Sequence, residues 1–339
     1  MVRTAVIGSG SWGTAVAALT CENADAVLWA RRDELALAVN ERHENPDYLP
    51  GCVLPGNLRA TADLGEAVDG ADVVVMGVPS HGFRAVLAEI ADLVPPDVPV
   101  VSLSKGVEQE TLLRMTEVVA EVLPDHRRDR IGVLTGPNLA REIAQGQPAA
   151  SVVAMDDEAT CEVLQGVFMT SRFRVYTNPD VVGCEVAGAL KNVMAIATGM
   201  AAGLGYGDNS RAALITRGLA ELTRLGVALG GSPLTFLGLA GIGDLVATCT
   251  SEQSRNRTVG FQLGQGRTLD EIVSEMRMVA EGVKSTAAVL ALAAREGIEM
   301  PIAEQVGAVL YEGREPAAMV DALMGREAKP ELHGIDGPA

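Results

Sequence analysis

Short runs of β-branched and aliphatic residues alternate with stretches of helical spacing throughout the first half of the sequence. Several of these runs are nearly uninterrupted Val, Ile and Leu, as expected for strands that crossover helices bury on both faces. This alternation predicts an α/β fold that begins with a Rossmann-like, doubly wound sheet. The strands are expected at 4–8, 26–30, 72–78, 98–102, 131–135, 151–154 and 173–176, with helices between them, for example at 11–19 and 83–93.

The pattern changes after residue 178, beyond which no further strand is expected. Apolar residues recur there at helical spacing and predict an all-α C-terminal domain. A chain of 339 residues is long for one hydrophobic core, which also favours two domains. We expect a sheet domain over 1–178, a helical domain over 179–327 and a disordered tail over 328–339. The helices are expected at 181–200, 211–229, 252–264, 269–276, 281–295, 302–310 and 316–324.

Charge and cysteine content narrow the class of protein and its compartment. The net charge of −17 argues against nucleic acid or an anionic membrane as the main partner. The first strand begins within the first residues and leaves no room for a signal peptide. The apolar stretch 181–202 contains Glu185, Lys191 and Asn192, and therefore predicts a buried helix, not a membrane anchor. The 5 cysteines are widely spaced and only 4 histidines are present, which indicates free thiols, no metal site and a cytoplasmic protein.

A glycine-rich segment joins the first predicted strand to the first predicted helix. Gly8, Gly10 and Gly13 form a G-x-G-x-x-G pattern with Ser11 and Trp12 inside it. The first glycine permits a tight turn, the second lets a pyrophosphate approach the backbone, and the third lets helix and strand pack closely. A plain glycine-rich turn is the alternative. The flanking strand and helix favour a dinucleotide site.

The second predicted strand ends at Arg31 and Arg32. A preference for NAD usually requires an Asp or Glu at this position, to accept a hydrogen bond from the ribose 2′-hydroxyl. Arginines suit a 2′-phosphate or the face of adenine instead. We therefore expect NADP in preference to NAD, with two solvated surface arginines as the alternative.

Two further segments follow predicted strands on the edge where open α/β sheets bind ligands. Lys105 comes just after the strand at 98–102 and can meet a phosphate or a carbonyl oxygen. The segment 136–140, which contains Gly136 and Asn138, follows the strand at 131–135 and offers main-chain N–H groups at the start of a helix. For Lys105 the alternative is an ordinary surface lysine.

Lys191 is one of two charged side chains in the apolar stretch 181–202. An unpaired buried lysine is costly, so Lys191 must have a partner or line a cavity. A lysine desolvated in this way has a lowered pKa that suits proton transfer. A structural ion pair with Glu185 is the alternative, but residues six apart on one helix do not share a face. Asp244, in a glycine-rich turn, is a plausible partner.

Ser254, Arg255 and Asn256 lie together near the start of the predicted helix 252–264. A hydroxyl, a guanidinium and an amide at a helix N-terminus can hold a phosphate. A polar helix cap with a surface arginine is the alternative.

Taken in order, these motifs resemble those of bacterial NAD(P)-dependent glycerol-3-phosphate dehydrogenases. The resemblance spans about residues 3–326 and rests on Gly-Ser-Gly-Ser-Trp-Gly at 8–13, Ser-Lys-Gly at 104–106, Gly-Pro-Asn-Leu-Ala at 136–140, Gly-Ala-Leu-Lys-Asn-Val at 188–193, Gly-Ile-Gly-Asp-Leu at 241–245, Ser-Arg-Asn-Arg at 254–257 and Val-Ala-Glu-Gly at 279–282.

The resemblance implies a reaction and residue roles. The reaction is the reversible reduction of dihydroxyacetone phosphate to sn-glycerol 3-phosphate for phospholipid synthesis. The hydride is expected to pass from the nicotinamide to the carbonyl carbon in a cleft between the two domains. Lys191 is implied as the general acid and base, and Lys105 as a contact of both substrate and cofactor. Asp244, Ser254, Arg255 and Asn256 are implied to bind substrate. The implied dinucleotide contacts are Ser11, Trp12, Ala140, Arg255, Val279 and Glu281.

Two other functions stay open from the residues alone. A dehydrogenase of a 3-hydroxy acid would favour a carboxylate substrate. A dinucleotide-sensing regulator would bind NADP without turnover, although a sensor needs no proton donor such as Lys191. A homodimer through the helical domain is a further expectation, because that domain has many apolar faces.

Overall fold

The computed structural model describes residues 1–276, 280–331, 333 and 334. The chain forms two compact units. The sheet unit comprises Met1–Ser104 and Leu113–Val181, and the helical unit comprises Lys105–Leu112 and Val182–Ala339. The segment Lys105–Leu112 therefore belongs with the helices, although it follows a strand in the sequence.

Within the described residues of the sheet unit, eight strands form one sheet. Their order is β3-β2-β1-β4-β5-β6-β7-β8, and every neighbouring pair is parallel except β6 and β7. The order reverses direction on either side of β1, which confirms the doubly wound arrangement expected from the sequence. The strands are β1 Arg3–Ile7, β2 Asp25–Trp29, β3 Arg59–Thr61, β4 Val73–Met76, β5 Val100–Ser102, β6 Ile131–Thr135, β7 Ala149–Ala154 and β8 Phe173–Asn178.

All seven predicted strands are present, and β3 is an additional strand that the sequence did not predict. Only Ala60 of its three residues is buried, so β3 lacks the apolar run that identified the others. It lies at the edge of the sheet, where it pairs with β2 alone.

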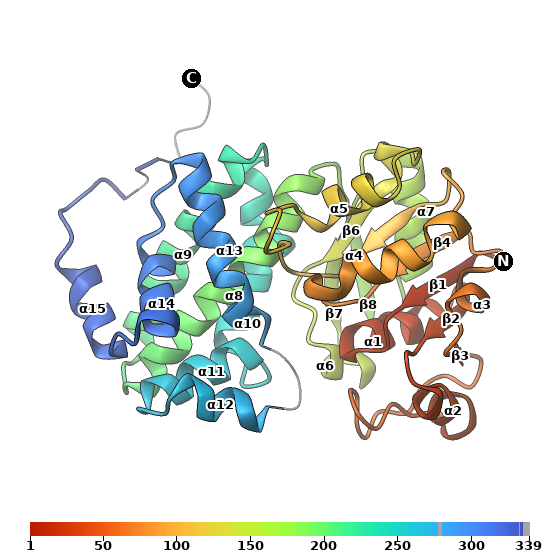
Figure 1. The fold of residues 1–339 in the computed structure, drawn as a ribbon, viewed down its shortest axis with the longest axis horizontal. Coiled ribbons are helices and arrows are strands. Elements are labelled where there is room, and N and C mark those ends of the chain that lie inside the picture. The colour runs from red at the N-terminus through yellow and green to blue at the C-terminus, as the bar shows by residue number, and fades with distance from the viewer. Residues whose placement is uncertain (277–279, 332, 335–339) are drawn as a thin grey trace. The chain divides into compact units, whose positions relative to one another are not determined.

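Both faces of the sheet are covered by helices (Figure 1). In β4, Val73 and Val75 pack into one hydrophobic cluster, whereas Val74 and Met76 pack into another. Successive side chains of a strand point to opposite faces, so a strand buried on both faces must be apolar throughout. The first cluster includes side chains of α1 (Ser11–Thr20), α2 (Asp33–Arg42), α6 (Ala140–Ala144) and α7 (Glu158–Phe168), and the second those of α3 (Leu64–Val68), α4 (Ser80–Glu89) and α5 (Met115–Val122).

The helical unit is built around α8 (Val181–Gly203), a buried helix of 23 residues (Figure 1). It is long and apolar enough to cross a membrane, but 94% of its apolar window is buried inside the structure. Core helices of this kind pass the same test of length and composition. A Cβ at Gly260 would lie 2.1 Å from the main-chain oxygen of Ile196, so only glycine allows a second helix to approach α8 this closely.

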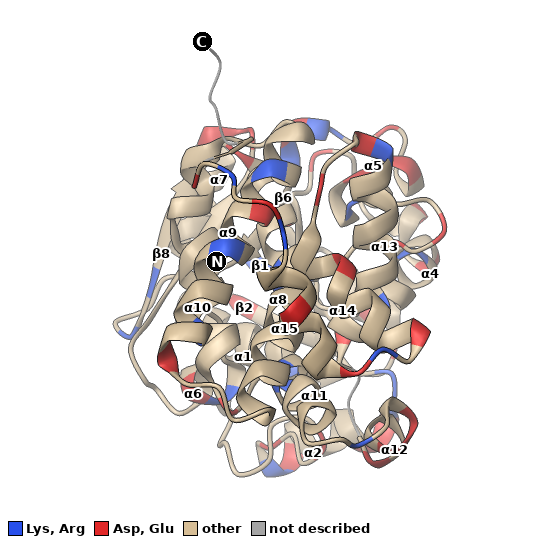
Figure 2. Cartoon of the chain, turned by 90° about the vertical axis from the view of Figure 1, so that its left-hand side faces the viewer, with Lys and Arg blue, Asp and Glu red and all other residues tan. Residues whose placement is uncertain are grey.

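The other helices of this unit confirm an all-α second half. They are α9 Asp208–Ala228, α10 Asp244–Thr250, α11 Arg255–Gly264, α12 Leu269–Glu275, α13 Glu281–Glu296, α14 Pro301–Glu312 and α15 Pro316–Met324, with a 3-10 turn at Pro233–Leu237 and a π turn at Leu239–Gly243. Figure 2 shows acidic and basic residues interspersed along the ribbon of the described residues.

The predicted disorder of 328–339 falls in part outside the described residues, which omit 332 and 335–339. Within the described part of this tail, Lys329 Nζ pairs with Glu299 at 2.9 Å. The main-chain oxygen of Glu331 accepts a hydrogen bond from Arg217 at 2.6 Å.

Candidate active site

The glycine-rich segment forms the predicted turn between β1 and α1. Gly8 has a φ of +119°, and a Cβ there would lie 2.7 Å from the main-chain oxygen of Gly77. A Cβ at Gly13 would lie 2.0 Å from the main-chain oxygen of Gly8. A side chain at either position would disrupt the packing of helix on strand.

Gly10 differs from its two neighbours because a Cβ there would have no atom within 4 Å. It is the N-cap of α1, where no side chain caps the helix. The first N–H groups of a helix have no partner within the helix and attract anions. Open space beside uncapped amides therefore fits the pyrophosphate of a dinucleotide.

Ser11 and Trp12 occupy the first turn of α1. The Ser11 hydroxyl donates to the main-chain oxygen of Tyr48. The Trp12 ring packs against Phe173, with centroids 6.2 Å apart, and its indole N–H has no partner among the described residues. Ala140 is the first residue of α6 and packs against the same apolar cluster as Trp12.

Arg31 and Arg32 follow β2 on the surface of the sheet unit. Arg32 is the N-cap of α2 and forms an exposed ion pair with Asp47. Arg31 makes no hydrogen bond or ion pair within the part of the chain that the structure describes. Of the two, Arg31 is therefore the guanidinium that is available to a 2′-phosphate.

Gly136 and Asn138 also belong to the sheet unit. Gly136 has a φ of +141°, and its Cβ position would lie 3.1 Å from Cα of Ser151. The Asn138 amide donates to Ser151 Oγ at 3.1 Å, and Ser151 Oγ in turn donates to the main-chain oxygen of Thr135. The Oδ1 atom of Asn138 is buried without a partner among the described residues.

Two lysines of the helical unit share one buried carboxylate, which forms the lysine cluster of Lys105, Lys191, Asp244 and Thr248. Lys105 Nζ donates to Asp244 Oδ2 at 2.7 Å, and Lys191 Nζ donates to Asp244 Oδ1. Asp244 is 1% exposed and Lys191 is 5% exposed. Lys191 Nζ also donates to Thr248 Oγ1 at 2.6 Å. Asp244 is thus the partner of Lys191 that the sequence indicated, although it begins helix α10 and does not lie in a turn.

The surroundings of Lys191 tune its proton affinity. Burial lowers the pKa of Lys191 to about 8, with Asp244 opposing and Lys105 adding to the decrease. An ammonium with a pKa near neutrality can both give and take a proton at physiological pH. The cluster can therefore serve general acid–base chemistry on an oxygen atom.

A chain of amide hydrogen bonds supports this cluster. Asn192 Nδ2 donates to the main-chain oxygen of Lys105 at 3.2 Å. Asn256 Nδ2 donates to Asn192 Oδ1 at 2.9 Å, and Asn256 Oδ1 accepts from the N–H of Gly282 at 2.9 Å. The sequence indicated Asn256 but did not indicate Asn192 or Thr248. Thr248 lies one helical turn beyond Asp244, so it shares a face of α10 with that carboxylate.

The remaining predicted residues that the structure describes lie at the starts of α11 and α13. Ser254 is the N-cap of α11, and its hydroxyl accepts from the N–H of Arg257 at 3.3 Å. Arg255 is the first residue of that helix and is exposed. Glu281 begins α13; burial raises the pKa of its carboxyl, and Arg255 and Lys105 oppose this increase. Val279 lies outside the described residues.

A dinucleotide-type sheet unit followed by a helical unit with a buried lysine–carboxylate cluster defines a two-domain NAD(P)-dependent dehydrogenase. Residues 3–161 match the N-terminus of NAD-dependent glycerol-3-phosphate dehydrogenase, and residues 180–321 match its C-terminus. The chain belongs to this family.

Individual relatives agree with the family match. A glycerol-3-phosphate dehydrogenase [NAD(P)+] of Thermobifida fusca is 55% identical over 339 residues, which cover 99% of this chain and 100% of the relative. The solved structure of glycerol-3-phosphate dehydrogenase from Coxiella burnetii is 37% identical, with a TM-score of 0.91, and the match covers 96% of this chain and 99% of that one. A yeast glycerol-3-phosphate dehydrogenase structure is 29% identical, with a TM-score of 0.83 and coverage of 95% and 99%.

Proposed function

We propose that this chain catalyses the reversible reduction of dihydroxyacetone phosphate to sn-glycerol 3-phosphate with NAD(P)H, and that Lys191 is the general acid and base. The family and its close relatives support the reaction. The observation that carries the residue assignment is the buried contact of Lys191 with Asp244, beside Lys105. The product is a phospholipid precursor, so the enzyme serves lipid synthesis.

Reduction of a ketone consumes one hydride and one proton. A bound reduced nicotinamide would supply the hydride. As negative charge develops on the carbonyl oxygen, Lys191 Nζ donates a proton to that oxygen, and in the reverse direction it accepts the proton. Asp244 favours the charged form of Lys191, and Lys105 adds a second positive charge that stabilises the developing alkoxide.

The start of α11 is the proposed site for the substrate phosphate. Arg255 is exposed there and carries a guanidinium that can hold a phosphate, and the N-terminus of the helix attracts anions. Both amide atoms of Asn256 are engaged by Asn192 and Gly282, so Asn256 fixes the position of this helix start. Holding the phosphate orients the ketone toward Lys191.

The glycine turn at Gly8, Gly10 and Gly13 is the proposed pyrophosphate site, with Ser11 and Trp12 beside it. Arg31 supports a preference for NADP because it has no partner in the described structure. Further proposed contacts of the dinucleotide are Arg32, Lys105, Ala140, Arg255 and Glu281, and of the substrate Gly136 and Asn138.

A cytoplasmic homodimer completes the proposal. The 5 cysteines are free thiols, as expected in a reducing compartment. Leu234 and Leu237 are exposed apolar side chains of the helical unit and could be buried between two copies. Sedimentation gives the mass of the unaltered chain and of Leu234→Glu, and we expect a dimer for the first and a monomer for the second. Identical masses would show either that the chain forms no dimer or that this face is not part of the interface.

The first experiment measures oxidation of NADPH with dihydroxyacetone phosphate, followed by the absorbance of the reduced nicotinamide and repeated with NADH. We expect rapid turnover, and none with dihydroxyacetone, which lacks the phosphate. Turnover of a 3-hydroxy acid with NADP in place of glycerol 3-phosphate would favour the carboxylate alternative. Tight cofactor binding without turnover would favour a sensor.

A further inference from the structure

A cavity of about 970 Å³ lies within the helical unit, and no residue of the lysine cluster lines it. Its walls come from α9, α14, α15 and, from the described part of the tail, Arg326, Glu327, Lys329, Pro330, Glu331, His333 and Gly334. This volume is typical of sites that enclose a small organic molecule. The proposed reaction makes no use of the cavity.

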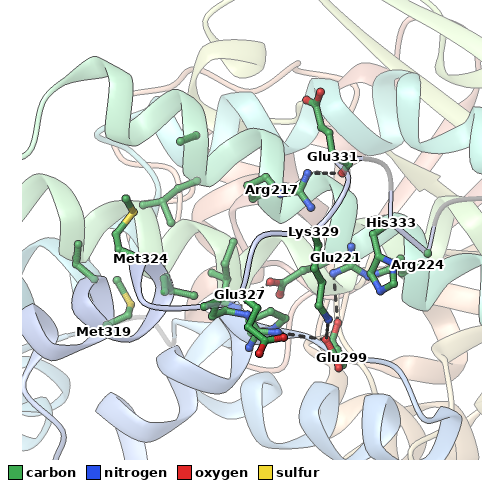
Figure 3. A pocket seen from close by; sticks show the side chains of 18 of the residues that line it. Arg217, Glu221, Arg224, Glu299, Met319, Met324, Glu327, Lys329, Glu331 and His333 are labelled. Atoms are coloured by element: carbon green, nitrogen blue, oxygen red, sulfur yellow. Dashed lines mark hydrogen bonds and ion pairs between the residues drawn. The ribbon is translucent and has the colours of Figure 1, made fainter.

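The cavity has an apolar end and a charged end. Figure 3 shows Met319 and Met324 on one side, and Arg217, Arg224 and His333 on the other. Further apolar lining comes from Leu214, Ile298, Val320 and Leu323. A ligand that fills such a cavity must itself have an apolar part and a polar head.

Arg217 and Arg224, at the charged end, use only some of their N–H donors within the described structure. Arg217 and Arg224 are two helical turns apart on α9, so they lie on one face. Arg217 donates to the main-chain oxygen of Glu331 at 2.6 Å, and Arg224 to that of Glu299 at 3.3 Å. Neither forms an ion pair with a carboxylate among the described residues. A guanidinium has five N–H donors, so most of theirs remain for an anion.

Four glutamates line the cavity, and two of them, Glu221 and Glu299, are engaged by other groups. Glu299 pairs with Lys329 at 2.9 Å and with Arg326 at 3.2 Å. Glu221 accepts from the N–H groups of Ile302 at 2.7 Å and Ala303 at 3.3 Å. Burial also raises the pKa of Glu221 to about 7, which reduces its negative charge at neutral pH. The head that the arginines favour is therefore negatively charged.

We propose that this cavity binds a single-chain anionic amphiphile, whose head contacts Arg217 and Arg224 and whose chain lies along Met319 and Leu323. Arginine forks match the planar or tetrahedral oxygens of a carboxylate or a phosphate. Burial of the chain adds affinity in proportion to the apolar area removed from water. The site is independent of the catalytic assignment.

The test is isothermal titration of the full chain with decyl phosphate below its micelle concentration. Inorganic phosphate and decanol, which supply only the head or only the chain, should each bind at least about tenfold more weakly. Decanoate compared with decyl phosphate distinguishes a carboxylate head from a phosphate head. We expect one decyl phosphate per chain.

Two kinds of variant locate the binding. The double variant Arg217→Ala, Arg224→Ala should weaken decyl phosphate binding by roughly 10- to 100-fold, the loss expected for charge-assisted hydrogen bonds. Arg211→Ala is the matched control, because Arg211 lies on the same helix but outside the cavity and pairs with Asp208. Arg255→Ala should leave binding unchanged, since the amphiphile does not use the substrate site.

Several results would overturn the proposal. These are unchanged affinity in the double arginine variant, loss of binding in Arg255→Ala, or no binding to the unaltered chain. If the double variant does not fold, Leu323→Asp at the apolar end must weaken binding of decyl phosphate, and unchanged affinity there overturns the proposal equally. Circular dichroism checks the fold of each variant.

Discussion

Lys105 Nζ lies 2.7 Å from Asp244 Oδ2, while the other oxygen of that carboxylate accepts from Lys191. The single negative charge of buried Asp244 thus pairs with two ammonium groups. Lys105 lowers the pKa of Lys191 and Asp244 raises it, and burial makes the net shift downward. This balance lets Lys191 both give and take a proton near neutral pH, as its proposed role requires.

Replacing Lys191 tests the proton donor directly. We expect Lys191→Met to fold and to lose about 10²- to 10⁴-fold in kcat, the usual contribution of general acid catalysis. The fold should survive because Asp244 keeps its ion pair with Lys105. Steady-state reduction of dihydroxyacetone phosphate gives kcat, and Lys284→Met on the surface is the control. A kcat close to that of the unaltered enzyme would remove the assignment.

The pH profile tests the same group without a mutation. Reduction needs the protonated lysine, so its rate should fall as pH rises through about 8, whereas oxidation of glycerol 3-phosphate should increase over the same range. Asp244→Asn removes the charge that favours the ammonium and should move both transitions to lower pH. Rates of both directions across pH provide the measurement. An unshifted transition in the variant would show that another group titrates.

Arg255→Ala tests the phosphate site. Loss of a charge-assisted hydrogen bond should raise KM for dihydroxyacetone phosphate by roughly 10- to 100-fold, with a smaller effect on kcat. Arg267→Ala is the control, because Arg267 lies just after α11 and pairs with Glu275. The phosphate site lies elsewhere if KM stays the same in both variants.

Arg31→Ala tests cofactor preference. Removing this guanidinium should raise KM for NADPH by about tenfold and change KM for NADH little, because only NADPH carries the 2′-phosphate. The ratio of kcat/KM for the two cofactors is measured, with Arg42→Ala on α2 as the control. Equal effects on NADPH and NADH would support the alternative of a solvated surface arginine.

Glu221 should make stability depend on pH. Burial raises the pKa of Glu221 from 4.5 to about 7, so the folded chain favours the protonated form. The resulting stabilisation is full below pH 4.5 and is lost as pH rises through about 7. The free energy of unfolding, compared with that of Glu221→Gln, should decrease by on the order of 3 kcal/mol across this range. Urea denaturation measures it, with Glu312→Gln at the exposed end of α14 as the control. A constant difference would contradict the prediction.

Local pattern was sufficient for most of the elements and for the residues that stand out within them, although the short helix α10 and the strand β3 were not predicted. Uninterrupted apolar runs identified the strands buried on both faces, and β3 was missed because only Ala60 in it is buried. Gly8, Gly10 and Gly13 were recognisable because their spacing places a residue without a side chain at each point of close approach in the turn. Lys191 was recognisable because a charge inside an apolar helix requires a partner.

Only the tertiary structure decided how the lysine cluster is assembled. Lys105 and Asp244 are 139 positions apart, and Lys191 and Asp244 are 53 apart. Lys105 follows a strand in the sequence, yet it packs with the helical unit. Periodicity and propensity describe neighbours along the chain, whereas such contacts depend on how whole elements pack. For the same reason the sequence revealed Lys191 and Asp244 but not Thr248 or Asn192, whose roles arise only from the atoms that they meet.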